Sequence, residues 1–262
     1  MTSLLDELLA AYDEQLRDGE PTGDVVQTTD GPLVRVEYPR RGFIGCRTLG
    51  GLEGADLDAL IARQVEFFRE RGLPVEWKTR GHDLPADLPD RLIAAGFVPE
   101  EQETVMIGES QAVADRLADV VLPDAVTIRR VTERDDLDRI AAMESEVWAD
   151  DWGWLAEDLD SRINADPEAM DVYVAEADGR VVSAAWAVHR EGTDFTGLWG
   201  GSTLAAWRRK GIYRALVAVR ARRAVERGHR YLQVDASPDS APILQALGFH
   251  AVTTTTPYVY TP

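Results

Sequence analysis

Hydrophobic residues recur along this chain with the period of helices and the period of strands in turn. In the first half, apolar positions spaced three and four apart predict helices over 3–17, 56–70 and 87–95. Short apolar runs predict strands over 33–38, 42–49, 75–79 and 103–108. The polar, glycine-containing segment 18–24 is typical of a turn. We therefore expect a mixed helix and strand domain over residues 1–109.

The second half repeats this alternation after Pro123. Residues 110–123 are mostly polar with one helical repeat, so we expect a helical linker there. Strands are predicted over 126–131, 171–177, 181–189, 195–204, 231–236 and 253–260, with a hairpin turn at Asp178-Gly179. One helix is predicted to begin after Thr132 as its N-cap, and a second covers 154–165. A third follows the strand at 195–204 and ends at 227, and a fourth covers 240–247. Residues 124–262 are expected to form a complete second domain.

The two halves share landmarks that indicate an internal repeat. Thr48-Leu49 stands before a helix that ends at Gly72, and Thr203-Leu204 stands before a helix that ends at Gly228. A later helix ends in Gly-Phe in both halves, at Gly96 and at Gly248. Generic alternation of strands and helices is the alternative explanation. Three matching landmarks favour a tandem of a truncated copy and a complete copy.

Composition restricts the class of protein and its partners. Hydrophobic residues at 45% and charged residues at 28% are typical of a globular protein. No apolar run is long enough to span a membrane, no signal peptide is evident and Cys46 is the only cysteine, so we expect a cytoplasmic protein without disulfides or a bound metal. A net charge of -18 argues against nucleic acid and anionic membranes as partners.

One stretch, from Trp199 to Arg214, departs from this acidic background. Its residues predict the end of a strand, then a basic turn containing Gly211, and then the first turn of a helix. The first N–H groups of a helix lack partners inside it and attract phosphate groups. Four side chains add positive charge at the same point: Arg208, Arg209, Lys210 and Arg214. The stretch is therefore a candidate phosphate site, with an ordinary solvated basic loop as the alternative.

The stretch also resembles the acyl-coenzyme A loop of the GNAT superfamily of N-acetyltransferases. That family carries Arg/Gln-x-x-Gly-x-Gly/Ala, and residues 208–213 match except that Tyr213 replaces the last small residue. The predicted elements of 124–262 follow the complete GNAT order. In the first half, residues 50–56 contain acids and no bases where the loop should be. The resemblance implies an α+β, α/β/α layered GNAT fold with splayed fourth and fifth strands and a degenerate N-terminal half.

The resemblance implies an acetyl-coenzyme A-dependent N-acetyltransferase that acts on an amine, as a monomer or homodimer. The acceptor would be a small molecule or a peptide. The residues implied at the cofactor are Ser202, Thr203, Leu204, Arg208, Arg209, Lys210, Gly211, Ile212, Tyr213, Arg214 and Ser237. Alternatively, Ser202 and Thr203 are ordinary strand residues that do not contact a cofactor. A non-catalytic acyl-coenzyme A sensor and a pure interaction domain are the alternative functions.

The catalytic acid is missing from its usual place. Many GNAT proteins carry a tyrosine four residues before the last Gly-Phe, where this chain has Leu244. Ser240, Tyr213, Tyr258 and Tyr260 are the candidate acids, with helix capping as the alternative for the serine and packing as the alternative for the tyrosines. Asp235, at the end of a predicted strand, is the candidate base, with an ion pair to an arginine as its alternative.

The acceptor is expected beside the first helices of the second half. Glu144, Trp148 and Trp152 are the candidate acceptor-binding residues there, among further acids and Trp154. Aromatic rings and carboxylates together suit a cationic or ring-bearing amine. Core packing is the expected alternative for Trp148. His189, on a predicted central strand, is expected to be structural.

Overall fold

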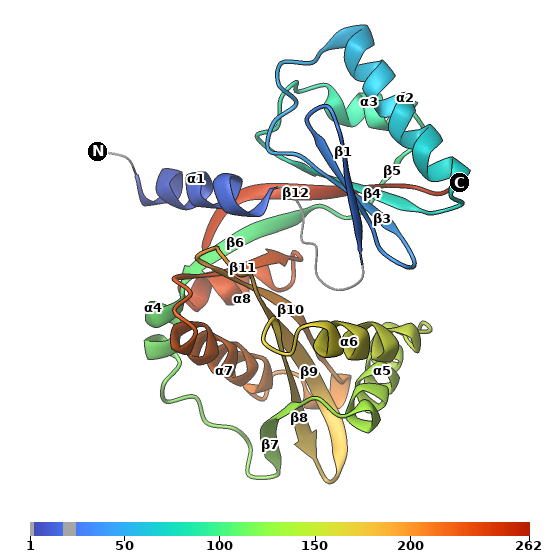
Figure 1. The fold of residues 1–262 in the computed structure, drawn as a ribbon. Helices are drawn as coiled ribbons and strands as arrows, with labels where there is room; N and C mark the ends of the chain where they lie inside the picture. Colours follow the sequence, from blue (N-terminus) through green and yellow to red (C-terminus); the bar gives the residue numbers. More distant parts are fainter. Residues whose placement is uncertain (1–2, 18–24) are drawn as a thin grey trace. The chain divides into compact units, whose positions relative to one another are not determined.

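The structure is a computed structural model of the chain, and it describes residues 3–17 and 25–262 (Figure 1). The predicted turn at 18–24 lies outside the described residues. Contacts divide the chain into two compact units, each with its own hydrophobic core. The first unit contains the residues up to Met106 together with 235–243 and 250–262. The second contains Ile107–Val234 and Leu244–Phe249. The chain thus passes between the units more than once, whereas the domain boundaries at 109 and 123 stay a prediction about the two sequence copies.

The first unit contains a mixed sheet with hydrogen-bonded order β1-β2-β3-β4-β12, and β5 pairs with β12. The bounds of these strands are β1 Val26–Asp30, β2 Leu33–Glu37, β3 Gly42–Gly45, β4 Val75–Arg80, β5 Val98–Pro99 and β12 His250–Tyr260. Its helices are α1 Leu4–Leu16, α2 Gly54–Glu70 and α3 Leu88–Ala94. β3 and β4 run parallel, whereas the other pairs are antiparallel. Strand β6 (Glu103–Glu109) carries the chain out of this unit.

The second unit contains strands in the order β11-β10-β9-β8-β7, of which only β10 and β11 are parallel. The bounds of these strands are β7 Val126–Val131, β8 Met170–Ala177, β9 Arg180–His189, β10 Phe195–Thr203 and β11 Tyr231–Ala236. Its helices are α4 Ser110–Arg116, α5 Arg134–Trp148, α6 Trp154–Ala165 and α7 Ile212–Glu226, and the short α8 (Ala241–Ala246) is shared with the first unit. The predicted α+β class with a mixed sheet is confirmed.

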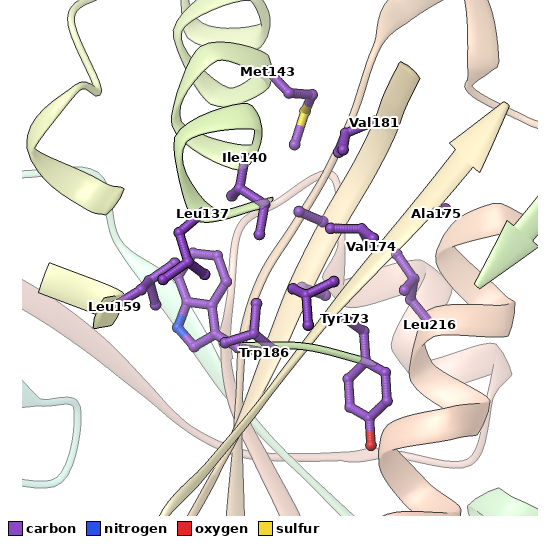
Figure 2. Packing of buried hydrophobic residues seen from close by; sticks show 14 of the residues in the cluster. Leu137, Ile140, Met143, Leu159, Tyr173, Val174, Ala175, Val181, Trp186 and Leu216 are labelled. Carbon is purple, nitrogen blue, oxygen red and sulfur yellow. The ribbon is translucent and has the colours of Figure 1, made fainter. Parts of the chain in front are cut away.

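Helices cover both faces of the sheet in the second unit. Strands β8 and β9 are buried along nearly their whole length, which requires apolar neighbours on each side. Figure 2 shows Leu137, Ile140 and Met143 of α5 on one side of these strands and Leu216 of α7 on the other. In this layered arrangement the core ends at the end of β10, and a loop connects β10 to α7.

The repeat predicted from the sequence is visible in the backbone. Helices α2 and α7 both end in a left-handed glycine, Gly72 and Gly228. In both, the next N–H bonds the carbonyl five residues back, at 3.1 Å in α2 and 2.9 Å in α7. Gly96 and Gly248 likewise have φ of 96° and 97° at the ends of α3 and α8. Each copy also has a parallel strand pair around its long helix, so the likeness extends beyond generic alternation.

Two local expectations were wrong. Strand β1 was not predicted, because its residues 26–30 are polar and mostly exposed at the edge of the sheet. Thr132 does not cap α5: the N-cap is Glu133, and its side chain accepts no capping hydrogen bond. Cys46 is buried as a free thiol. None of the helices in the described part of the chain is both long and apolar enough to span a membrane.

Candidate active site

Strands β10 and β11 separate part-way along their length. They pair in parallel through Phe195↔Tyr231, Thr196↔Leu232 and Gly197↔Gln233, and the pairing stops there. β10 continues to Thr203, held only by β9 through Ser183↔Thr203. The predicted splay of the fourth and fifth strands of the second copy is therefore present, and it leaves one edge of β10 without a ladder partner beyond Gly197.

A glycine bulge lies on this unpaired part of β10. The register with β9 shifts between Gly200 and Ser202, so Gly201 has no opposite residue. Gly200 and Gly201 have φ of 66° and 93°, a region that side chains with a Cβ rarely adopt. A Cβ on Gly200 would lie 2.7 Å from the Trp186 ring, and one on Gly201 would lie 2.9 Å from the Tyr213 ring. Both conformation and space therefore require glycine here.

The contact with Gly201 also settles where Tyr213 points. The ring packs against the bulge of β10 from the first turn of α7. Burial raises the pKa of its hydroxyl above the usual value. Tyr213 therefore fills space behind the bulge, and the loop pattern has lost a small residue at this position without losing the loop.

The three residues after the bulge are fixed by hydrogen bonds from β9 and the basic loop. The Ser183 hydroxyl donates to the Ser202 carbonyl at 2.6 Å and lies 2.8 Å from the Thr203 hydroxyl. The Leu204 N–H donates to the Val182 carbonyl at 3.0 Å. Leu204 itself is buried in the core of the second unit. The end of β10 is therefore rigidly placed.

The basic loop between β10 and α7 presents unpaired positive charge. A short 3-10 turn at Ala205–Trp207 leads to Arg209 and Gly211, which have φ of 60° and 83°. Gly211 is the N-cap of α7 and has no side chain to cap the helix, so the first N–H groups of α7 receive no side-chain cap. The Arg208 Nε donates to the Thr203 carbonyl at 2.9 Å, and the Lys210 ammonium stands over the Trp207 ring at 4.5 Å.

The four cations at this loop differ from most arginines of the second unit. Arginines elsewhere in it form ion pairs with carboxylates: Arg129, Arg130, Arg139, Arg180, Arg223 and Arg227. Arg208, Arg209, Lys210 and Arg214 are exposed and form no ion pair with any residue in 3–17 or 25–262. In a chain of net charge -18, such a cluster is a candidate binding site for an anion.

Arg220 anchors α7 behind the same strand, and the sequence reading missed it. The guanidinium is 2% exposed and donates to the carbonyls of Leu216, Trp186 and Trp199 at 2.9, 3.3 and 3.1 Å. Burial lowers its pKa to about 10. It follows Ile212 and Leu216 at intervals of four on the buried face of α7, which was the available signal.

Glu144, expected to line the acceptor site, is buried beside the bulge. It extends from α5 and is 2% exposed. Its Oε2 accepts from the Trp148 indole N–H at 2.9 Å. The same indole N–H lies 3.3 Å from the Ser202 oxygen. The structure thus brings together three of the predicted residues, two from α5 and one from β10.

Three tryptophans form a stack at the C-terminal end of α5. The rings of Trp148 and Trp152 are 6.3 Å apart at 27°, and those of Trp152 and Trp154 are 5.4 Å apart at 30°. Trp148 is 59% exposed, so the expectation that it packs in the core was wrong. Its ring is held at the surface by the hydrogen bond to Glu144. The neighbouring acids Asp150 and Asp151 accept backbone N–H groups within the loop to α6.

Four of the predicted site residues belong to the first unit. Asp235 forms an ion pair with Lys78 at 2.7 Å, and this pair with its acidic neighbours raises the pKa of the buried Lys78 ammonium above its usual range. Tyr258 is buried in the core of the first unit, opposite Trp77 of β4. Ser237 and Ser240 hydrogen-bond each other, with their hydroxyl oxygens 3.2 Å apart. Their catalytic and cofactor roles stay predictions.

Two further sequence readings concern the core. Leu244, at the position of the family's tyrosine, is fully buried, and its carbonyl accepts the Phe249 N–H at 3.1 Å. It therefore serves the end of α8 and offers no proton. His189 is 4% exposed and sits between Thr196 and Asp171 in a hydrogen-bonded network, as a structural histidine does. No group of three metal-binding side chains gathers anywhere in the described part of the chain.

Comparison with known protein families decides what this arrangement is. Residues 136–249 match the model of the acetyltransferase (GNAT) family. This part of the chain is similar to a GNAT domain. The matched span contains β10 with its bulge, the basic loop and α7, so the match covers the geometry described above. It supports acetyl transfer as the class of activity.

Solved structures extend the likeness of fold to nearly the whole chain. A GCN5-related N-acetyltransferase from Kribbella flavida is 15% identical, with 99% of this chain and 95% of that chain covered at a TM-score of 0.66. A tandem GNAT protein from the clavulanic acid biosynthesis pathway is 14% identical, with 94% and 85% covered at a TM-score of 0.63. The curated proteins contain no match. At such identities the neighbours show the fold alone, and that fold is the tandem GNAT fold.

Proposed function

We propose that the second copy binds acetyl-coenzyme A and transfers its acetyl group to an amine. The observation that carries this proposal is the cluster of four unpaired cations at the uncapped start of α7, directly after the splayed end of β10. A helix N-terminus with added arginines suits a pyrophosphate group. The bulge at Gly200-Gly201 leaves backbone groups of β10 free of the ladder for an extended arm to bond.

Each part of the second copy has a task in this proposal. Arg208, Arg209, Lys210 and Arg214, with the first N–H groups of α7, hold the phosphates. The backbone of Ser202 and Thr203 orients the arm beside β10, and Ser183 keeps that backbone in place. The thioester, when bound, supplies an activated acetyl group. The stacked tryptophans Trp148 and Trp152 hold the acceptor next to Glu144.

The first copy is proposed to bind no coenzyme A. Its long helix α2 also begins without a side-chain cap, but the residue at the N-cap is Glu53 and Asp56 lies in the first turn. The three glycines of this loop, Gly50, Gly51 and Gly54, have positive φ, and the charge at the start of α2 is opposite to that at the start of α7. Negative charge at this position repels a phosphate.

The cofactor loop is tested by reversing one charge. Arg209→Glu should weaken acetyl-coenzyme A binding at least tenfold in calorimetric titration, because an unpaired cation beside the phosphates becomes an anion. Arg222→Glu is the matched control, since Arg222 is exposed on α7 two turns further on and should bind as the wild type does. Equal affinities for the two variants would refute the loop as the phosphate site.

A non-catalytic acyl-coenzyme A sensor is the second candidate. The buried Leu244 favours it, since the usual proton donor is absent from α8. The two functions differ in turnover. Release of free thiol from acetyl-coenzyme A in the presence of a panel of amines supports the transferase, whereas saturable binding without thiol release supports the sensor.

A further inference from the structure

We infer that the Glu144 carboxylate is the base that takes the proton from the acceptor ammonium, and that this acceptor carries a flat apolar group. The inference rests on the proposed function and adds a catalytic residue and a substrate class to it. Four observations in the second unit carry it: the burial of the carboxyl, its free oxygen, its place at the bulge and the tryptophan stack beside it.

The Glu144 carboxyl has an unused acceptor in a buried place. Oε2 accepts from Trp148, but Oε1 is removed from solvent and has no hydrogen-bond partner. Buried carboxylate oxygens are normally satisfied, because leaving one unpaired costs free energy. A glutamate that only held α5 to β10 would need one oxygen. The second oxygen is available to a group that arrives from outside, and an ammonium is the natural donor.

The position of this carboxyl suits proton transfer during acetyl transfer. Ser202 is the first residue after the bulge, at the part of β10 that no longer pairs with β11. The Trp148 indole N–H lies 3.3 Å from the Ser202 hydroxyl oxygen and 2.9 Å from Glu144 Oε2, so it links the two residues. The carboxyl is therefore tied to the same strand segment that is proposed to orient the thioester arm, within reach of a nucleophile that approaches that segment from the α5 side.

The surroundings of Glu144 raise the pKa of its carboxyl. Burial raises this pKa most, while the neighbouring polar side chains of Ser202 and Trp148 lower it by less. Helix α6 and strands β9 and β10 pack against α5, and none of their ionisable groups contributes to this shift; these groups are Glu157, Asp158, Asp160, Arg162, Arg180 and His189. A base without a fixed cation partner is free to take a proton, in contrast to Asp235, which is paired with Lys78.

The step balances with the Glu144 carboxylate and the two proposed substrates. The acceptor arrives as an ammonium with three protons, and one passes to the Glu144 carboxylate. The freed nitrogen lone pair then forms the C–N bond to the acetyl carbonyl carbon while the C–S bond breaks. A second proton leaves nitrogen for the departing sulfur, giving the amide, the free thiol and a protonated Glu144. Loss of that proton to solvent restores the carboxylate.

The tryptophan stack defines what the amine carries. Trp148 links the two features, because its indole N–H bonds Glu144 while its ring begins the stack with Trp152 and Trp154. Trp148 is 59% exposed, so a large part of its aromatic surface is open to a ligand. Flat apolar or aromatic groups pack on such faces. Amines with a ring a few bonds from nitrogen are therefore the expected acceptors, ahead of polar aliphatic amines.

Titration of Glu144 is measurable without any substrate. The Trp148 indole ¹⁵N–¹H resonance, assigned with Trp148→Phe, should shift with pH as the carboxyl that accepts its hydrogen bond gains a proton. Its midpoint should lie above the ordinary glutamate pKa of about 4.3. The shift should vanish in Glu144→Gln and remain in Glu133→Gln, an exposed glutamate at the other end of α5. A midpoint at or below the ordinary value would overturn the inference.

Kinetics then test the role in transfer. Glu144→Gln should bind acetyl-coenzyme A with wild-type affinity and lose at least 100-fold in kcat, and its rate should no longer fall at low pH through the wild-type midpoint. Glu133→Gln should match the wild type. If the wild type acetylates amines and Glu144→Gln does so equally fast, the inference fails and the proposed function stands. If the wild type binds no acetyl-coenzyme A, the proposed function fails first.

A comparison of acceptors tests the second part of the inference. A ring-bearing amine and an aliphatic amine of similar basicity are compared with the wild type and with Trp148→Phe and Trp152→Ala. The ring-bearing amine should have the lower KM. In Trp152→Ala, the ratio of the KM of the aliphatic amine to the KM of the ring-bearing amine should fall at least tenfold. Equal KM values for the two amines in the wild type would overturn the assigned substrate class.

Discussion

Asp171 shows how a single residue holds the second unit together. Its side chain is almost fully buried at the start of β8, and its oxygens accept from His189, Arg223 and Arg130 at 2.8, 2.7 and 2.6 Å. These hydrogen bonds and charges lower its pKa to about 2 against the effect of burial. Burial lowers the pKa of His189, so at neutral pH the histidine is uncharged and Asp171 serves two arginines.

Removing this charge should destabilise the fold. Asp171→Asn leaves two partly buried arginines without their shared carboxylate, and we expect a loss of about 3 kcal/mol in the free energy of unfolding. Urea denaturation at pH 7 measures it. Asp138→Asn, which removes an exposed carboxylate paired with Arg134 on α5, should cost less than about 0.5 kcal/mol.

The pH dependence of the Asp171 effect follows from the direction of its shift. Because the pKa is lower in the folded state, the contribution to stability is fully present above the unfolded value of about 3.9 and is lost as pH falls through about 2. The stability difference between wild type and Asp171→Asn should therefore be constant above about pH 5 and shrink below pH 4. A difference that grows on acidification would contradict the assigned ion pairs.

Single residues also show where sequence reading reaches its limit. The cluster of cations in the basic loop is recognisable in the sequence, because it depends only on residue type and spacing. The sequence also marks Glu144 as a candidate residue, but its burial depends on Trp148 and on Ser202, which is far away in the chain. Arg220 was missed because a charged residue in a helix is normally exposed. Contacts between distant segments are what composition and spacing leave out.

At the scale of elements, strand β10 determines the site more than any helix does. It is paired on both edges up to Gly197 and on one edge beyond it, and the bulge at Gly201 lies in the second part. Two aromatic rings, Trp186 and Tyr213, close against the bulge glycines. The shape of this short segment sets where the ends of β10 and α7 present their backbone groups.

The bulge is tested by adding one methyl group. Gly201→Ala should lower stability by about 1–3 kcal/mol, since the new Cβ is strained at a φ of 93° and collides with Tyr213. It should also weaken acetyl-coenzyme A binding at least tenfold by moving β10. Gly192→Ala is the control, because its φ is 73° and its Cβ would meet nothing within 4 Å.

Thermal unfolding and calorimetric titration of both glycine variants distinguish strain from function. The control should lose some stability and keep its affinity, while Gly201→Ala should lose both. Full affinity in Gly201→Ala would show that the bulge has no part in binding. Loss of affinity in both variants would show that the effect follows stability alone.

Most elements were predictable because their apolar periods are strong. Helix α6 and strands β7 and β11 begin and end at the predicted residues. The Asp178-Gly179 turn joins β8 to β9, and both residues have positive φ, as such a turn requires. Strand β1 could not be predicted, since it is polar and exists only through pairing with β2. Edge strands of this kind carry little hydrophobic signal.

At the scale of the whole molecule, one chain carries two versions of the same backbone plan. Both copies have parallel strands around a long helix, ended by the same left-handed glycine pattern. The copies differ in the charge at the start of that helix, with Glu53 and Asp56 in the first and the four cations in the second. The sequence predicted this difference, because it depends only on residue type next to a shared landmark.

The assignment of residues to compact units could not be predicted in the same way. Asp235, Ser240 and Tyr258 lie within the second copy in sequence, yet they belong to the first unit. The last strand, β12, pairs with β4 and β5 of that unit across a large sequence separation. Such long-range pairing leaves no local pattern in the sequence. The catalytic roles predicted for these three residues depend on which strands pair with which, and the sequence alone does not show this.

We propose that the charge at the helix start makes the second copy a coenzyme A site and leaves the first copy empty. Calorimetric titration of the wild-type protein with acetyl-coenzyme A counts the sites. We expect saturable binding of one molecule per chain, and the same number of sites when Glu53 is changed to Gln. Two molecules per chain would contradict the reading of the first loop, and no binding would contradict the proposed function of the second.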